Sequence, residues 1–286
     1  MQAILKFGSK GSDVITLQQQ LKKLGFKGVK GKELSIDGDF GASTEYAVIT
    51  FQKQKNLVAD GKVGDKTRSA LLEQNISKLL KDSDYKKAAE RLKVSELVIR
   101  VFGAVEGQGV GFLKNGKPKI LFERHRMYAY LRLKKGAAFA NKMEAERPNI
   151  VNRKYGGYQG NEAEYVRLEQ AKQIDVESAL MSTSWGQFQV MGENWKDLGY
   201  ASVQEFVDQQ FVNESNQLEA FIRFIEWKTG IIEKKKVALI DALRAKNWDV
   251  VFTLYNGPNY KKLGYQAKFQ KEYDHLEPLY SETKAA

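Results

Sequence analysis

The stretch Leu97-Val-Ile-Arg-Val-Phe-Gly-Ala-Val-Glu-Gly-Gln-Gly-Val-Gly-Phe-Leu113 joins an apolar, helix-like pattern to a glycine-rich segment. Apolar residues recur at positions 97, 98, 101, 102 and 105, as on one face of a helix, and Ser95 is placed to cap its start. Glu106 lies four residues after Phe102, on this apolar side. Glycines at positions 107, 109 and 111 allow the chain to turn sharply and leave space beside the carboxyl group.

A single β-hairpin is expected directly after this helix. The dipeptide Asn115-Gly116 strongly favours a tight hairpin turn. It is flanked by two mainly apolar runs that are typical of strands, Val110–Leu113 and Lys119–Phe122. Other periodic stretches predict helices over about residues 83–92, 161–180, 203–212, 214–229, 237–246, 248–255 and 265–280. The sequence after residue 82 therefore predicts a mostly helical domain with a small β element.

The position of Glu106 suggests acid–base chemistry. A carboxyl group held against an apolar wall loses hydration of its charged form, so its pKa rises toward neutrality. Such a group can donate a proton near pH 7, as cleavage of a glycosidic bond requires. A solvated glutamate at a fraying helix end fits the same spacing, and the spacing alone leaves both interpretations open.

An internal repeat organises the N-terminal part of the chain. Asp37-Gly-Asp-Phe-Gly-Ala-Ser-Thr-Glu-Tyr-Ala47 is echoed 23 residues later by Asp60-Gly-Lys-Val-Gly-Asp-Lys-Thr-Arg-Ser-Ala70. Each copy is typical of an Asp-Gly turn followed by a helix, and a further amphipathic helix is expected over about residues 12–24. Three short helices joined by glycine turns predict a small domain over residues 1–76, followed by a linker at 77–82 and a larger domain at 83–286.

The composition narrows the chemistry. The 286-residue chain has no cysteine and only two histidines, which excludes disulfide scaffolds, thiolate zinc sites and cysteine nucleophiles and argues against a multi-histidine metal site. We therefore expect carboxylates to carry the acid–base chemistry, with no metal and no cofactor. With 42% apolar residues the chain can bury a sizeable core.

The formal charge of +11 points to a polyanionic partner without specifying it. The basic residues form no stripe and no nucleic-acid-binding motif, so we expect no nucleic-acid partner. No stretch has the pattern of a signal peptide or of a membrane span, so we expect a protein made in the cytoplasm without membrane insertion. We also expect a monomer.

About residues 5–73 resemble the type 1 peptidoglycan-binding domain found on many cell-wall hydrolases. The matching positions are Leu17-Gln18…Leu21…Leu24-Gly25-Phe26, Asp37-Gly38…Phe40-Gly41…Thr44…Ala47-Val48…Phe51-Gln52 and Asp60-Gly61…Val63-Gly64…Thr67…Leu71. The resemblance implies bacterial peptidoglycan as the partner. The apolar residues of the motif belong to a core, whereas the polar groups near the turns, Asp37, Asp39 and Gln52, are weaker candidates for contact with the wall.

About residues 82–279 resemble the N-acetylmuramidase domain of modular endolysins from phages that infect Gram-negative bacteria. The matching residues are Val105-Glu106…Gly109…Gly111-Phe112-Leu113, Ile120-Leu121-Phe122-Glu123-Arg124-His125 and Ser184-Trp185-Gly186-Gln187-Phe188-Gln189. The segment 182–192 also resembles the W-G-x-x-Q-x-M stretch of goose-type lysozymes and lytic transglycosylases. Tyr255-Asn256-Gly257-Pro258 resembles their Y-N-G motif.

This resemblance implies a lysozyme-like fold in which Glu106 is the catalytic acid. Glu123 is the candidate for a second group, because it ends the hairpin strand and could activate the attacking water from about 6.5–9.5 Å away in an inverting mechanism. The alternative role for Glu123 is an ion pair with Arg124 or Arg126. A hydroxyl group of Ser182, Thr183 or Ser184 could orient the water instead.

Further side chains suit N-acetylated sugars, since aromatic faces can stack on sugar rings and amide or hydroxyl groups can bind their substituents. The candidates are Trp185, Gln187, Gln189, Tyr255 and Asn256, together with the hydroxyl residues at 182–184. Trp185 fits a core position equally well, and His125 is more simply a structural hydrogen-bonding residue.

The sequence thus predicts a two-domain endolysin that hydrolyses the β-1,4 bond between N-acetylmuramic acid and N-acetylglucosamine. It would be made in the host cytoplasm and act in the periplasm after release. A lytic transglycosylase giving 1,6-anhydromuramyl products is one alternative, and a non-catalytic wall-binding phage structural protein is another. We expect residues 1–76 to bind peptidoglycan alone and residues 80–286 to keep the chemistry alone.

Overall fold

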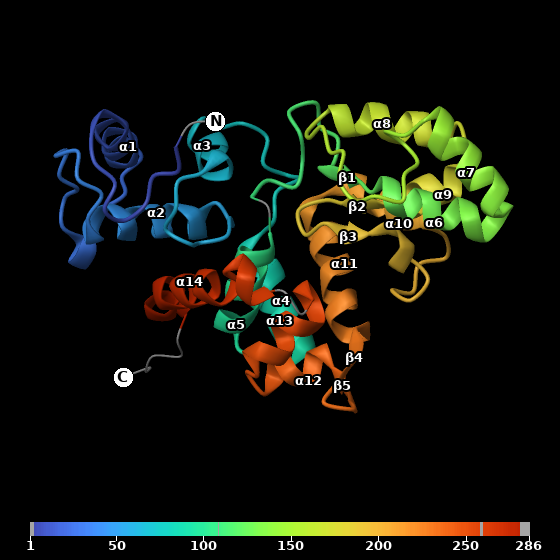
Figure 1. Ribbon diagram of the computed structural model, residues 1–286. Helices are drawn as coiled ribbons and strands as arrows, with labels where there is room; N and C mark the ends of the chain where they lie inside the picture. The colour runs from blue at the N-terminus through green and yellow to red at the C-terminus, as the bar shows by residue number, and fades with distance from the viewer. Residues whose placement is uncertain (1–2, 108, 258–259, 281–286) are drawn as a thin grey trace.

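The computed structural model describes residues 3–107, 109–257 and 260–280, and these residues form fourteen α-helices and two small antiparallel sheets (Figure 1). The mainly helical class expected from the sequence is confirmed. Two separate hydrophobic cores organise the helices, a small one among the N-terminal elements and a large one among the rest.

The N-terminal elements enclose the small core. They are α1 (Ser12–Lys23), the 3₁₀ turn η1 (Val29–Gly31), α2 (Ala42–Gln54) and α3 (Asp65–Leu71). The predicted apolar stripes supply this core, in which seven side chains are fully buried: Val14, Leu21, Phe40, Ala47, Val48, Phe51 and Val63. Burial of the valine, leucine and phenylalanine side chains stabilises the small domain by about 1.5–3 kcal/mol each.

The first copy of the repeat builds its turn around one buried amide. Gln18 Nε2 donates to Asp37 Oδ1 at 2.8 Å, to the main-chain oxygen of Asp39 at 3.0 Å and to Thr44 Oγ1 at 3.1 Å. Its Oε1 accepts from the main-chain nitrogen of Gly38 at 2.9 Å. The Asp-Gly pair and the threonine of the motif are therefore fixed by a glutamine on the preceding helix.

The second copy repeats this arrangement. Gln52 Nε2 donates to Asp60 Oδ1 at 3.0 Å, to the main-chain oxygen of Lys62 at 2.9 Å and to Thr67 Oγ1 at 3.1 Å, and its Oε1 accepts from Gly61 at 2.9 Å. The side chains of both glutamines are buried. Each repeat unit therefore consists of a helix glutamine, an Asp-Gly turn and a following threonine.

The larger part begins with α4 (Asp82–Leu92) and α5 (Glu96–Glu106). It continues with α6 (Arg124–Lys135), α7 (Ala137–Glu146), α8 (Ala163–Lys172), α9 (Val176–Met181), η2 (Gly192–Asn194), α10 (Val203–Val212), α11 (Glu214–Trp227), α12 (Leu239–Arg244), α13 (Trp248–Asn256), η3 (Tyr260–Leu263) and α14 (Tyr265–Tyr280). The strands are β1 (Ile120–Phe122), β2 (Thr183–Trp185), β3 (Val190–Met191), β4 (Thr229–Ile232) and β5 (Lys235–Ala238).

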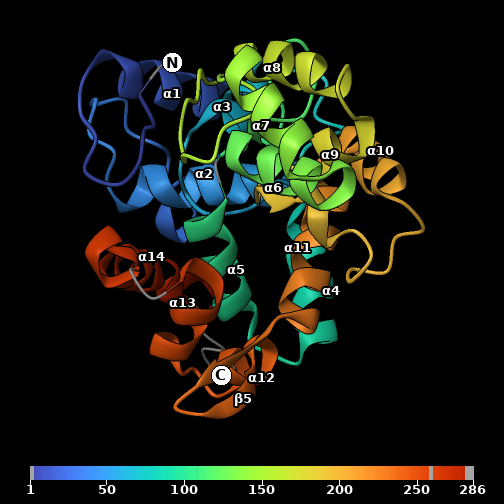
Figure 2. The same cartoon turned by 45° about the vertical axis from the view of Figure 1, so that its right-hand side comes forward.

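Helix α5 lies at the centre of the larger part. It packs against α14 on one side and against α4 on the other, which Figure 2 shows. Ser95 caps it as expected, accepting from the main-chain nitrogen of Val98 at 3.3 Å, and such caps typically contribute about 1 kcal/mol. Ile99, Val101 and Phe102 are fully buried, so most of the helix that ends at Glu106 is enclosed by its neighbours.

The predicted hairpin is partly wrong. The turn at Asn115-Gly116 forms, and Leu113 donates to the main-chain oxygen of Lys117 at 2.8 Å. The following strand β1 then leaves this turn and pairs with β2, which pairs in turn with β3. The pairing of the hairpin extends as far as Lys119, because Phe112 forms an antiparallel bridge with Pro118 and the main-chain nitrogen of Lys119 donates to the main-chain oxygen of Gly111 at 2.8 Å. From Ile120 onward the main chain pairs with residues 183–185 instead.

Two helix boundaries also differ from expectation. The stretch 161–180 is divided into α8 and α9, because Asp175 caps a new helix by accepting from Ser178 N at 2.9 Å. Between α11 and α12 the chain forms the β4–β5 hairpin, whose turn residues Glu233 and Lys234 have positive φ angles. The lysines at 234–236 belong to this hairpin rather than to a helix or a loop.

The segment expected to be a linker is an ordered joint. Leu79 packs against the small core, whereas Leu80 is buried in the large one. Lys81 forms a bridge with Leu57, and α4 already begins at Asp82. The change of core at residues 79–80 agrees with the position at which the sequence divides.

Candidate active site

Glu106 is the last residue of α5 and is partly buried. The side-chain nitrogen Nδ2 of Asn256, the last residue of α13, donates to Glu106 Oε1 at 3.3 Å and to Oε2 at 3.2 Å. Two of the predicted site residues, 150 positions apart in the chain, are thereby in contact. Pro258, the fourth residue of the Tyr255-Asn256-Gly257-Pro258 stretch, lies outside the described residues.

The surroundings of Glu106 favour its protonated form. Burial raises its pKa from the usual 4.5 to about 7, while the hydrogen bond from Asn256 and the charge of Lys268 oppose this rise. The sequence suggested this effect from the apolar stripe alone. A carboxylic acid with such a pKa is protonated in about half of the molecules at neutral pH and can give its proton up.

Tyr255 forms an aromatic wall beside the acid. Its ring lies edge-on to those of Phe102, Phe221 and Phe224, at centroid distances of 5.2, 5.7 and 5.6 Å. Burial raises the pKa of Tyr255 well above 10, and the nearby charge of Glu106 raises it further. Its hydroxyl group therefore remains protonated, and its ring contributes to the desolvation of the acid.

Tyr265, at the start of α14, is a neighbour of Glu106 that the sequence did not indicate. Burial raises its pKa, and so does the charge of Glu106, while a side-chain hydrogen bond with Asn256 lowers it. The acid is thus surrounded by groups from α5, α13 and α14. Only the first two of these carry recognised motifs.

Glu123 lies in a different cluster. Tyr158 donates its hydroxyl proton to the carboxylate, at 2.8 Å from Oε2 and 3.0 Å from Oε1, and His125 Nδ1 lies 3.2 Å from Oε2. The two arginines considered as partners bind elsewhere: Arg124 donates to main-chain oxygens of residues 148, 154 and 155, and Arg126 forms an ion pair with Glu193. Glu123 is therefore oriented by the hydroxyl group of Tyr158, with His125 close beside it.

The three hydroxyl residues before Trp185 are buried in the sheet. Ser182 and Thr183 have no exposed surface, and Ser184 is 5% exposed. Thr183 Oγ1 donates to the main-chain oxygen of Ala179 at 2.9 Å, and Ser184 Oγ donates to Gln189 Oε1 at 2.8 Å. In this arrangement Thr183 and Ser184 stabilise β2 and its turn, whereas the buried hydroxyl group of Ser182 has no hydrogen-bond partner among the described residues.

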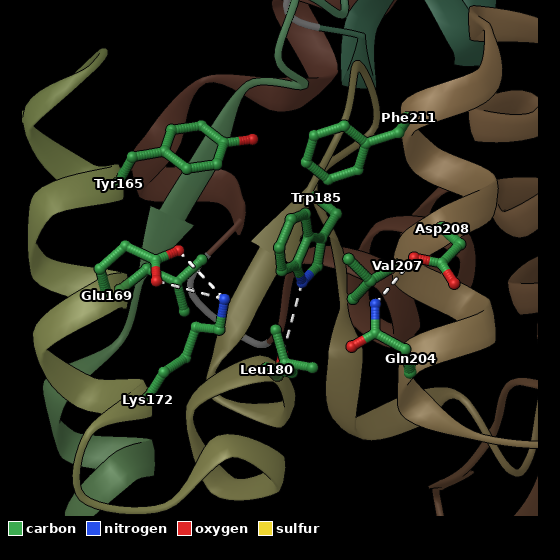
Figure 3. A pocket seen from close by; sticks show the side chains of 10 residues that line it. Tyr165, Glu169, Lys172, Leu180, Trp185, Gln204, Val207, Asp208 and Phe211 are labelled. Carbon is green, nitrogen blue, oxygen red and sulfur yellow. Dashed lines mark hydrogen bonds and ion pairs between the residues drawn. The ribbon is translucent and has the colours of Figure 1, made fainter.

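Trp185 occupies the core position that the sequence left open. Its side chain is 1% exposed, and its Nε1 donates to the main-chain oxygen of Leu180 at 3.4 Å. The indole and the ring of Phe211 line a cavity of about 240 Å³ between α8 and α10 (Figure 3). A ring so deeply buried offers little surface on which a sugar could stack.

Gln187 and Gln189 shape the turn between β2 and β3. The main-chain nitrogen of Gln187 donates to Gln217 Oε1 at 2.7 Å, and Gln189 Nε2 donates to the main-chain oxygen of Gly186 at 2.8 Å. Gly186 has a φ of +74°, and a Cβ there would lie 2.7 Å from the side chain of Gln217. The W-G-x-x-Q pattern is therefore explained by a tight turn packed on α11.

The candidate wall-binding residues differ in exposure. Gln52 is buried inside the second repeat unit. Asp37 is exposed, and the main-chain nitrogen of Asp39 and the amide of Gln18 lower the pKa of its carboxyl group. Asp39 is exposed as well and forms a surface ion pair with Lys10 at 3.0 Å. The two aspartates are accessible to a ligand, whereas Gln52 is not.

Two further findings concern what the described residues do not contain. Within residues 3–107, 109–257 and 260–280, no three histidine, aspartate or glutamate side chains are grouped so as to hold a metal ion. No helix in the same ranges is long and apolar enough to cross a membrane.

A mainly helical fold with a neutral glutamate at the end of a buried helix is the arrangement expected of lysozyme-like proteins. The family model of N-acetylmuramidases matches residues 95–277, which is more than half of the chain, and a peptidoglycan-binding-domain model matches residues 10–71. The chain therefore belongs to the N-acetylmuramidase family and carries a peptidoglycan-binding domain. The resemblance drawn from the sequence is confirmed.

Solved and curated relatives agree with this assignment. The crystal structure of the Burkholderia AP3 phage endolysin superposes with a TM-score of 0.85 at 42% identity, covering 96% of this chain and all of that one. The spore cortex-lytic enzyme of Bacillus cereus is 41% identical over 69 residues, and that of Halalkalibacterium halodurans is 37% identical over 68 residues. These matches cover 24% of this chain and 25% and 19% of the respective relatives, so the chain spans a quarter or less of their length.

Proposed function

We propose that the protein is a peptidoglycan hydrolase that cleaves the β-1,4 bond between N-acetylmuramic acid and N-acetylglucosamine, with Glu106 as the general acid. The observation that carries this proposal is the desolvated Glu106 carboxyl group, whose pKa of about 7 keeps a proton available at neutral pH. Membership of the N-acetylmuramidase family and the similarity to a phage endolysin support it.

In the proposed reaction Glu106 gives its proton to the glycosidic oxygen as the bond from the sugar carbon to that oxygen breaks. The leaving sugar departs as a neutral alcohol, and a water molecule adds to the carbon and loses a proton. Glu106 becomes negatively charged in this step. The amide of Asn256, at 3.2–3.3 Å, and the positive charge of Lys268 then stabilise the carboxylate that forms.

Glu123 is the proposed second catalytic group. Burial raises the pKa of Tyr158, so its hydroxyl group remains a donor and fixes the carboxylate of Glu123. A carboxylate oriented in this way suits the activation of a water molecule. The alternative to Glu123 is a hydroxyl group of Ser182, Thr183 or Ser184, which would orient the attacking water by hydrogen bonding.

The small domain is proposed to hold the enzyme on the wall, with Asp37 and Asp39 as exposed polar groups available for contact. We retain residues 1–76 and 83–286 as the two domains and 77–82 as the joint, which agrees with the change of core at Leu79 and Leu80. Attachment raises the local concentration of the catalytic site at the wall. We further propose a monomer that is made in the host cytoplasm and acts in the periplasm after release.

Mass spectrometry of the products from purified peptidoglycan tests this proposal. A hydrolase leaves a reducing-end N-acetylmuramic acid, and we expect that product from the wild-type chain. A product lighter by one water would indicate a 1,6-anhydro end, and hence a lytic transglycosylase. Binding to sacculi without any released product would support a non-catalytic wall-binding protein instead.

A further inference from the structure

Lys66, a residue of the peptidoglycan-binding domain, reaches into the catalytic domain. It lies in the first turn of α3, and its Nζ is 2.6 Å from Glu214 Oε2 and 3.2 Å from Gln187 Oε1. Its side chain is 19% exposed, and that of Glu214 is not exposed at all. A fully buried carboxylate needs a partner charge. The ion-pair partner of Glu214 is Lys66 from the other domain, and the charge of Lys119 in the catalytic domain also acts on this carboxylate.

Glu214 connects this cation to the main chain around the active site. Its Oε1 accepts from the main-chain nitrogen of Gly111 at 2.6 Å, and its Oε2 accepts from that of Leu80 at 2.6 Å. Gly111 follows Glu106 by five residues, and Leu80 lies in the joint between the domains. One carboxylate therefore fixes the segment after the catalytic acid, the joint and the binding domain together.

The second contact of Lys66 leads to the same segment. A Cβ on Gly107, the residue next to Glu106, would lie 3.1 Å from Gln187 Nε2. Gln187 is itself held by Gln217 on α11. The side chain that Lys66 binds thus lies directly against the backbone at the end of α5.

Lys62 offers a comparison within the same domain. Its Nζ lies 2.6 Å from Glu272 Oε2 on α14, with exposures of 24% and 17% for the two side chains. This pair also joins the domains, and its carboxylate is a different one from the carboxylate that Lys66 binds. It provides a matched ion pair between the same two domains that does not involve Glu214.

We infer that Lys66 is a positioning residue for the catalytic site: by pairing with Glu214 it fixes the main chain at Gly111, and by binding Gln187 it supports Gly107 next to Glu106. The inference rests on the proposed function, because it assumes Glu106 to be the acid. In this inference the binding domain helps to position the catalytic site as well as attaching the enzyme to the wall. The catalytic domain is accordingly complete only when the binding domain is docked.

The test uses the full-length chain and short soluble glycan strands from peptidoglycan, with which attachment to an intact wall plays no part. We expect Lys66→Met to lower kcat about tenfold or more with KM within about threefold, since small displacements of a catalytic group have large effects. Lys66→Arg, which keeps the charge, should restore kcat to within about threefold of wild type. Lys62→Met should leave kcat unchanged.

Hydrogen–deuterium exchange provides a readout independent of activity. Peptides covering residues 107–113 should exchange faster in Lys66→Met than in wild type or Lys62→Met. If Lys66→Met does not fold, Lys66→Met/Glu214→Gln removes the unpaired buried charge. It should still show the loss in kcat, because an amide offers one oxygen where the carboxylate offered two to the N–H groups of Gly111 and Leu80.

The outcomes separate this inference from the proposed function. The positioning role would be overturned if Lys66→Met showed normal kcat and normal hydrogen–deuterium exchange. If the double variant has to be used instead, a normal kcat in that variant would overturn it. An inactive Glu106→Gln in the same assay would then leave the proposed function standing. Normal turnover by Glu106→Gln would overturn both.

Discussion

The amide nitrogen of Asn256 donates to both carboxylate oxygens of Glu106, at 3.3 and 3.2 Å. Burial and this hydrogen bond act in opposite directions on the acid. Burial favours the neutral form that starts the reaction, and the amide favours the charged form that follows proton donation. The balance places the pKa of Glu106 at about 7.

Asn256→Ala should raise the pKa of Glu106, because it removes a donor to the charged form. The alkaline limb of the pH profile of kcat/KM, where the acid loses its proton, should move up by about one unit. Turnover should fall because the carboxylate formed in the reaction is less stabilised. Lys268→Met, which removes a more distant charge, is the control and should move the limb less, in the same direction. A limb that moves to lower pH would contradict the assigned hydrogen bond.

The raised pKa also predicts how stability depends on pH. Glu106 has a pKa of about 7 in the folded chain and about 4.5 when solvated. Its contribution is therefore fully present below pH 4.5 and is lost as the pH rises to 7, a loss of about 3 kcal/mol. Glu106→Gln avoids this loss. Urea unfolding should show the variant to be more stable than wild type at pH 8 and similar to it at pH 4.5.

The control for that comparison is Glu90→Gln, an exposed position on α4. It should show little difference from wild type at either pH. A gain for Glu106→Gln of the same size at pH 4.5 and pH 8 would mean that the carboxyl group is not desolvated in the folded chain.

Glu123→Gln separates three roles for the second carboxylate. If Glu123 activates water, turnover should fall at least about a hundredfold with an unchanged melting temperature. A joint fall in turnover and melting temperature would indicate that Glu123 supports β1 and α6, with a hydroxyl group at 182–184 orienting the water. Unchanged kinetics would remove it from the catalytic groups. Tyr158→Phe, which removes only the hydroxyl that fixes Glu123, should show a weaker form of the same effect.

Gln18→Ala should destabilise the small domain by about 1–3 kcal/mol, because it leaves the buried N–H groups of the first turn without an acceptor. Gln52→Ala should have a similar effect through the second turn. Gln19→Ala, an exposed neighbour on α1, should change stability little. Urea unfolding followed by fluorescence measures all three. Equal stabilities for Gln18→Ala and Gln19→Ala would contradict the role assigned to Gln18, and a much smaller loss for Gln52→Ala would contradict the structural equivalence of the two repeats.

The local patterns of the sequence were sufficient for much of this fold. The stripe from Leu97 to Val105 determines α5 and the desolvation of Glu106, since helical periodicity is a local property. The repeat likewise revealed its Asp-Gly turns. The pairing of β1 with β2 was not accessible in this way, because its strands of three residues lie sixty positions apart and their alternation is too short to recognise.

The other features that the sequence did not predict depend on polar contacts between residues far apart in the chain. Lys66 and Glu214 looked like ordinary helix-surface charges, and nothing in their local spacing indicated that they meet in a buried pair. The joint at 77–82 is ordered and this pair links the two domains, so the expectation that each domain acts alone stays a prediction for the separate fragments. Trp185 shows the reverse case, because a motif typical of the family led to a sugar-binding role while its local burial points to the core.

The turnover of purified peptidoglycan by Glu106→Gln tests the central claim most directly. Glutamine keeps the shape of the side chain and the contact with Asn256 but has no proton to donate, so we expect a loss of roughly 10²–10⁴ in kcat with unchanged binding to sacculi. Glu90→Gln should retain full turnover in the same assay. Activity of Glu106→Gln within about tenfold of wild type would show that Glu106 is not the general acid.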